Sequence, residues 1–140
     1  MLNRWIEPQA CKSLAVLVET VTAPLLIQHE SPVCLELDIP TLMPLPADVH
    51  QTAELLRTLV IQSLAEMPEG GDLLITACET ADGVELELAD SGSDLDQRPQ
   101  SRPISAASIG ANLKWQNCPQ GGAAVTINFG KKGEIGRTVA

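Results

Sequence analysis

Apolar side chains recur along this chain with the spacing of amphipathic helices in two places. Pro24 is expected to end the first helix, whose stripe consists of Leu14, Leu17, Val18 and Val21. The second stripe is broader, with Asp48 as a candidate N-cap and Pro68 just beyond its end. The sequence predicts helices over residues 10–22 and 48–66, and a shorter one over 107–117.

Alternation of apolar and polar residues predicts strands elsewhere in the chain. In the first such segment the apolar side chains fall on one face, and Glu36 and Asp38 fall on the other. Asp82 and Gly83 separate two alternating runs and predict a hairpin turn between them. The expected strands cover residues 33–39, 73–79, 84–89 and 124–129.

Each alternating strand has one apolar face, and the helix stripes can cover it. The expected fold class is therefore α+β, a two-layer α/β sandwich whose mixed sheet is covered on one face by helices. A chain of 140 residues has the length of one domain, which is expected to span residues 1–130, before a loose tail over 131–140. Residues 91–107, rich in Ser, Asp and Pro, are expected to form a mobile loop. The core is expected to include Leu56, Leu59, Val60, Ile75, Leu86 and Leu88.

Charge and composition exclude some classes of partner. The formal net charge is −9 at pH 7, and every acidic residue except Glu134 lies within residues 1–96. Such acidity disfavours nucleic acid as a partner, and the chain has almost no aromatic residues on which bases could stack. No apolar run reaches the roughly 18 to 20 residues that a membrane span needs, and the N-terminal residues lack a signal-peptide pattern. A cytoplasmic protein without nucleic-acid or membrane partners is expected.

The cysteines and histidines do not form a metal-binding pattern. The spacing of the cysteines contains no CxxC pair, so a zinc site is not expected. Cys34 and Cys78 lie in strand-like segments, where a small buried thiol is the ordinary expectation. His29 and His50 lie apart and are expected to be surface or capping residues.

The order of features between Glu54 and Asp90 carries a family resemblance. A long helix is followed by Pro-Glu-Gly-Gly, a Leu-rich strand, an Asp-Gly hairpin and a strand that ends in Ala-Asp-Ser-Gly. Over roughly residues 30 to 130 this order resembles the ATP-binding domain of sensor histidine kinases, which are Bergerat-fold (GHKL) ATPases. The resemblance implies three nucleotide-binding boxes, and in this chain each of them is altered.

On the helix, the resemblance places Gln62 at the position of the family's magnesium-binding Asn, which makes it a weak candidate metal ligand. Gln62 is one methylene longer than Asn, so a bound Mg²⁺ would be displaced. Thr58 occupies the position of the general base or water-ordering residue, although it is no base near pH 7. Ala65 occupies the position of a cationic phosphate contact and carries no charge.

In the second box, the resemblance assigns Asp90 to the adenine amino group and Gly92 to the first glycine, while Asp94 replaces the second glycine. The third box retains Gly110 where a run of glycines would open a helix and bind phosphates. Arg98 and Arg102, in the loop that resembles the nucleotide lid, could compensate in part as phosphate contacts. Structural interpretations are also open: Asp90 as a turn carboxylate, and Gln62 as a solvated or hydrogen-bonded polar residue. Gly70, Gly71, Gly121 and Gly122 are most simply turn glycines.

The resemblance, with these substitutions, implies a degenerate histidine-kinase-like ATPase domain, a pseudokinase of two-component signalling that has lost phosphoryl transfer. It would act as a regulatory or protein-interaction module in signal transduction, as a monomer or weak dimer with a signalling protein partner. No cofactor is expected, and ATP with Mg²⁺ would bind weakly or not at all. The alternative is an active stand-alone ATP-binding protein kinase of the anti-sigma-factor type. A phosphoryl-accepting domain is disfavoured because residues 1–30 cannot build its four-helix dimer module.

Overall fold

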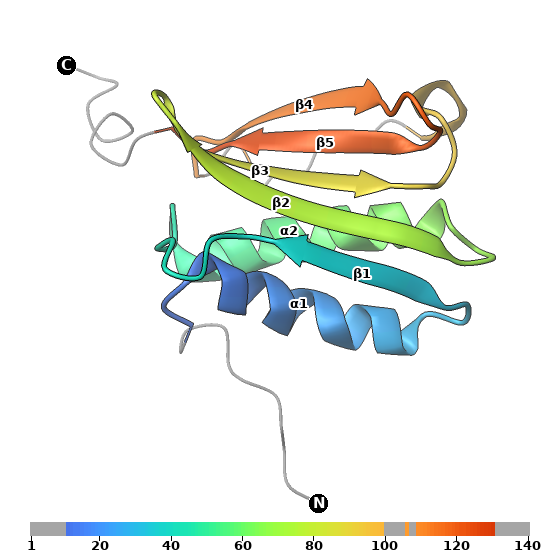
Figure 1. Cartoon of the computed structure of the whole chain (residues 1–140), viewed down its shortest axis with the longest axis horizontal. Helices are drawn as coiled ribbons and strands as arrows, with labels where there is room; N and C mark the ends of the chain where they lie inside the picture. Colours follow the sequence, from blue (N-terminus) through green and yellow to red (C-terminus); the bar gives the residue numbers. More distant parts are fainter. Residues whose placement is uncertain (1–10, 100–105, 107–108, 131–140) are drawn as a thin grey trace, which may run out of the picture.

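The computed structural model describes residues 11–99, 106 and 109–130. Two helices, α1 (Leu14–Gln28) and α2 (Val49–Ala65), lie on one face of a five-stranded sheet (Figure 1). The strand order is β1-β2-β3-β5-β4, with β1 parallel to β2 and the other neighbours antiparallel. The strands are β1 (Val33–Asp38), β2 (Gly71–Thr80), β3 (Gly83–Asp90), β4 (Asn112–Asn117) and β5 (Ala123–Asn128). The predicted α+β sandwich with a mixed sheet is therefore confirmed.

Each helix begins at a side chain that caps it, and Asp48 of α2 is the cap predicted from the sequence. The Asp48 carboxylate accepts a hydrogen bond from the Gln51 amide at 2.9 Å, which satisfies one of the free donors of the first turn of α2. At α1 the Ser13 hydroxyl has the same function. The predicted end of α1 at residue 22 is wrong, because the helix continues through Pro24 to Gln28. Burial of Leu25 on the far side of the proline offsets the backbone hydrogen bond that Pro24 cannot donate.

The predicted helix over residues 107–117 is wrong. Residues 112–117 form β4, an edge strand that pairs antiparallel with β5. Leu113 and Trp115 are half-buried and point to the helix-covered face of the sheet, while the residues between them are exposed. This period of two is a strand pattern, and it outweighs the helix propensity of the segment once β5 offers a partner.

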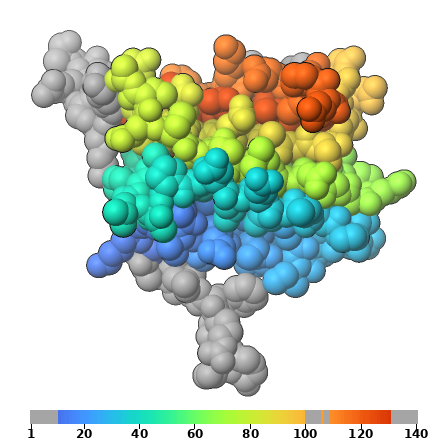
Figure 2. Space-filling view, viewed as in Figure 1, coloured from blue at the N-terminus to red at the C-terminus, as the bar shows by residue number. Residues whose placement is uncertain are grey.

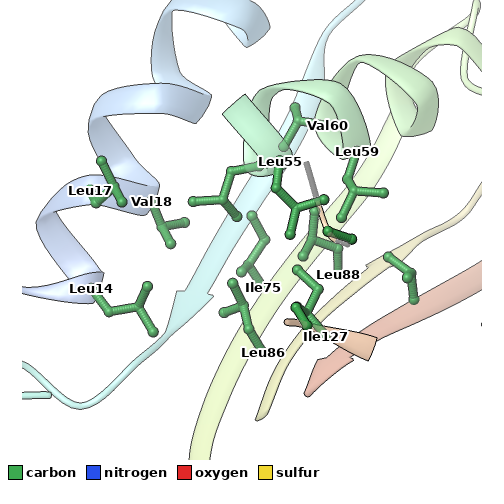
Figure 3. Packing of buried hydrophobic residues seen from close by; sticks show 14 of the residues in the cluster. Leu14, Leu17, Val18, Leu55, Leu59, Val60, Ile75, Leu86, Leu88 and Ile127 are labelled. Atoms are coloured by element: carbon green, nitrogen blue, oxygen red, sulfur yellow. The ribbon is translucent and has the colours of Figure 1, made fainter. Parts of the chain in front are cut away.

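The core lies between the two helices and the sheet. Side chains from α1, α2 and the strands point towards one another there (Figure 3). Leu55, Leu59, Ile75, Leu86 and Ile127 are at most 1% exposed. All six predicted core residues are buried.

The opposite face of the sheet is not covered by either helix. Cys34 and Cys78 lie on this face and are exposed, so their predicted burial is wrong. In β1, Cys34 shares its side of the strand with Glu36 and Asp38, which is the side that α1 and α2 leave uncovered. Among the described residues, no helix combines the length and the apolar character needed to cross a membrane.

Candidate functional site

Asp90 is the last residue of β3 and lies on the core face of the sheet, opposite Leu73 in β2. Its side chain is only 2% exposed. Both carboxylate oxygens accept hydrogen bonds from the Arg98 guanidinium, Oδ2 from Nη1 at 3.0 Å and Oδ1 from Nη2. Oδ1 also accepts from the backbone amides of Gly92 at 2.9 Å and Ala123 at 3.4 Å. The carboxylate is therefore bound by donors of the chain itself.

Arg98 joins three parts of the structure. Its side chain is 8% exposed, and its Nε donates to the carbonyl of Ser93 at 2.8 Å. The Glu66 carboxylate, at the end of α2, lies 4.0 Å from the same Nε. A guanidinium buried between two carboxylates satisfies the usual condition for a charge inside a protein, because it is paired and hydrogen-bonded.

The segment after Asp90 is fastened to the sheet. It contains a short 3-10 helix, η2 (Leu95–Gln97), and the amide of Leu95 donates to the Asn117 side chain of β4 at 2.8 Å. With the Arg98 contacts, this bond holds the described part of the predicted mobile loop against β3 and β4. The remainder of that loop includes Arg102, which lies outside the described residues.

Two glycines allow the backbone to close around Asp90. A Cβ at Gly92 would stand 2.5 Å from the carbonyl oxygen of Glu66, so β3 and the end of α2 could not approach as they do. At Gly122 the backbone φ is +89°, and a Cβ would stand 2.0 Å from the carbonyl oxygen of Asp90. Contact between protein segments thus accounts for Gly92 without any ligand.

The residues that the resemblance assigned to magnesium and phosphate lie on α2. Thr58 and Gln62 are one helical turn apart and half-buried, while Ala65 is exposed. Across the described segments, no three His, Cys, Asp or Glu side chains are grouped so that they could hold a metal ion. Of the three positions on this helix, the resemblance assigned only Gln62 to the metal.

Gly110, the residue retained from the third box, does not open a helix. It lies in an exposed turn that leads directly into β4, and its φ is 70°. The free amides of a helix N-terminus are therefore absent from residues 109–117, the part of this box that the structure describes.

Cys118, after the end of β4, reports on the charges of the site. Burial raises the pKa of the Cys118 thiol, the Asp90 and Glu87 carboxylates raise this pKa further, and the Arg98 guanidinium lowers it. The thiol is partly exposed, so reagents can reach it.

We expect Cys118 to be alkylated more slowly at neutral pH than in the unfolded chain, since a raised pKa leaves less thiolate. The Arg98→Ala change removes the cation that lowers the pKa, so the pH midpoint of alkylation should move further up. Above the ordinary pKa of a thiol, the unfolded chain loses this proton before the folded protein does, so the thiol's contribution to stability declines as pH rises. Peptide-resolved mass spectrometry of iodoacetamide labelling against pH measures these rates. An unchanged midpoint in the variant would contradict the proximity of Arg98 to the thiol.

The partner of Asp90 is a residue that the sequence pattern did not predict. Arg98 is expected from the resemblance to contact phosphates from the lid, but it is bound to Asp90. The signal in the sequence is slight: an arginine eight positions beyond a carboxylate that ends a strand. The structure brings together Asp90, Gly92 and Arg98, while Thr58 and Gln62 lie on α2 and Gly110 lies in the turn before β4.

No family model matches this sequence, and no curated protein matches it either. Solved structures do resemble it in fold. The catalytic domain of histidine kinase ThkA superposes with a TM-score of 0.68 at 16% identity, covering 85% of this chain and 94% of that one. The mycobacterial sensor histidine kinase MprB gives 0.65 at 13% identity, covering 81% and 91%. The cytoplasmic segment of histidine kinase QseC gives 0.61 at 19% identity, covering 84% and 70%.

Proposed function

We propose that this chain, whose fold is that of histidine kinase catalytic domains, is a degenerate ATPase domain that serves as a regulatory or protein-interaction module in signal transduction. The observation that carries this proposal is β4. A strand occupies residues 112–117, where the resemblance implies a helix that opens at a glycine-rich box. Residues 109–117, as the structure describes them, therefore cannot offer phosphates the row of amides found at a helix N-terminus.

The other substitutions act in the same direction. Phosphoryl transfer depends almost entirely on positioning and on electrostatic stabilisation of the phosphates. Gln62 displaces the metal, Ala65 provides no cation, and the exposed Asp94 adds negative charge. We therefore propose that the domain is not an enzyme, and that a pseudokinase role is the one its residues favour.

The residues present do not fit ATP with Mg²⁺. Asp90, the expected adenine ligand, already accepts hydrogen bonds from Arg98, Gly92 and Ala123. Gln62 would be the remaining ligand for the metal, and one carboxamide is a poor substitute for the several oxygens that Mg²⁺ requires. Nucleotide affinity should accordingly be very weak.

We expect titration calorimetry of the wild-type chain with ATP and Mg²⁺ to give no heat of binding at millimolar nucleotide. The matched control is Asp90→Asn, which should behave in the same way. Micromolar affinity that this variant abolishes would overturn the proposal. It would favour the alternative, an active ATP-dependent protein kinase of the anti-sigma-factor type.

The surface of α1 supports the interaction role. Among its residues only Glu19 is charged, and on its outer side Val16 is 40% and Ile27 is 74% exposed. This helix forms part of the molecular surface (Figure 2). Apolar residues on both sides of a helix are typical of one that packs against further protein. We propose a signalling protein as the partner and a monomer or weak dimer as the state of the free chain.

The compartment and the excluded partners follow from similar reasoning. The net charge of −9 repels nucleic acid and anionic lipid headgroups, so neither is proposed as a partner. The QseC structure is described as a cytoplasmic segment, and we propose the cytoplasm for this chain as well. We also propose that residues 1–130 form one domain and that residues 131–140 form a tail.

A further inference from the structure

We infer that Arg98 is a built-in occupant of the adenine position at Asp90, and that this side chain decides that the site excludes nucleotide bases. The inference rests on the proposed function, which treats Asp90 as the counterpart of an adenine-binding carboxylate. It goes further because it names one residue as the cause of exclusion and predicts what its removal will admit.

Donors of the chain itself surround the Asp90 carboxylate. An ionised carboxylate offers about four acceptor positions on its two oxygens. Oδ1 accepts from Nη2 of Arg98 and from the amides of Gly92 and Ala123, whereas Oδ2 accepts from Nη1 of Arg98. The side chain is 2% exposed, so an amino group from solvent has no path to the acceptor position that remains on Oδ2.

The Arg98 guanidinium is a stronger hydrogen-bond donor to Asp90 than an adenine amino group would be. The guanidinium offers two parallel N–H groups and a full positive charge, whereas an adenine amino group is neutral. Charge-assisted bidentate hydrogen bonds are roughly twice as strong as neutral ones. Binding of adenine would therefore replace the stronger Arg98–Asp90 contact by a weaker one. It would also leave Glu66 as the remaining carboxylate beside the buried Arg98.

Arg98 is held in place by two further hydrogen bonds. Its Nε donates to the Ser93 carbonyl, and the Leu95 amide, three residues earlier in the chain, donates to the Asn117 side chain. Arg98 also follows Asp90 by only eight residues in the same chain. A tethered group acts at an effective concentration of about millimolar or more, which free nucleotide must exceed to displace it.

Removal of the guanidinium should leave a buried carboxylate in need of donors. The ligand class expected to satisfy it is a planar ring that bears an amino group, and adenosine is the probe because it carries no phosphate. Binding of adenosine therefore tests the base position without the defects on the phosphate side. The altered residues on the phosphate side are part of the argument for the proposed function, and the titration with ATP tests them.

The experiment compares the wild-type chain with Arg98→Ala and Arg98→Lys by calorimetry and thermal denaturation in adenosine. We expect no binding to wild type and an affinity about tenfold higher or more for Arg98→Ala. Lysine keeps a cation at Asp90, so Arg98→Lys should not bind adenosine. Arg57→Ala, which removes an exposed cation from α2, is the matched control and should not bind. The double variant Asp90→Asn with Arg98→Ala should lose the gained affinity.

A second measurement covers the case in which Arg98→Ala folds poorly. Methylguanidinium at millimolar concentration should raise the melting temperature of Arg98→Ala more than that of wild type, because it refills the same position. Absence of both adenosine binding and this rescue in Arg98→Ala would overturn the inference and leave the proposed function standing. Wild-type binding of ATP through Asp90 would overturn both, which separates the two failures.

Discussion

Replacement of Asp90 by asparagine should lower the free energy of unfolding by about 3–5 kcal/mol, the usual cost of removing one partner of a buried ion pair. The side chains of Asp90 and Arg98 are 2% and 8% exposed, so water cannot replace the lost partner. An asparagine amide also has only one acceptor oxygen, and its NH₂ group would face donors that now point at a carboxylate. Urea denaturation of the two proteins measures the difference.

A double-mutant cycle separates the pair from its surroundings. Arg98→Met alone should also be costly, because it leaves Asp90 charged and buried with only the Gly92 and Ala123 amides. Asp90→Asn combined with Arg98→Met should be less destabilised than the sum of the single variants. Additive losses, or a loss below about 1 kcal/mol in Asp90→Asn, would mean that the buried pair does not hold the end of β3 to the following segment.

Replacement of Leu86 by alanine should cost about 2–5 kcal/mol, because it leaves a cavity in the core. Leu86 is fully buried in β3, beside Ile127 of β5, beneath the helices that Figure 3 shows. The surrounding side chains come from rigid elements and can collapse only in part. Chemical denaturation measures the loss.

Glu87→Ala is the matched control for Leu86, because the next residue of β3 points to the uncovered face of the sheet. This change should alter the free energy of unfolding by no more than about 0.5 kcal/mol. Comparable losses in the two variants would contradict the assignment of the apolar face of β3 to the core.

The elements that could be predicted from the sequence are those with a strong local pattern. The Asp48 cap, the period of two in β1 and β3 and the Asp82-Gly83 turn each depend on residues close together in the chain. Local patterns failed in two places. At Pro24 the core contacts of Leu25 carry the helix past a residue that ordinarily ends one. At residues 112–117 the strand forms because β5, the next element of the chain, offers its edge, and the apolar spacing within the segment alone does not indicate that pairing.

The candidate site also has features that local sequence predicts and features that it does not. The pattern of residues predicted that a carboxylate, Asp90, ends a β-strand beside glycines, and the family resemblance implied that the residues for metal and phosphate binding are replaced. The folded structure shows in addition that Arg98 binds Asp90 and that β4 stands where a helix was expected. The physical reason is that periodicity and capping are set by neighbours along the chain. The partner of a buried charge and the edge on which a strand pairs are set by which segments the folded core brings together.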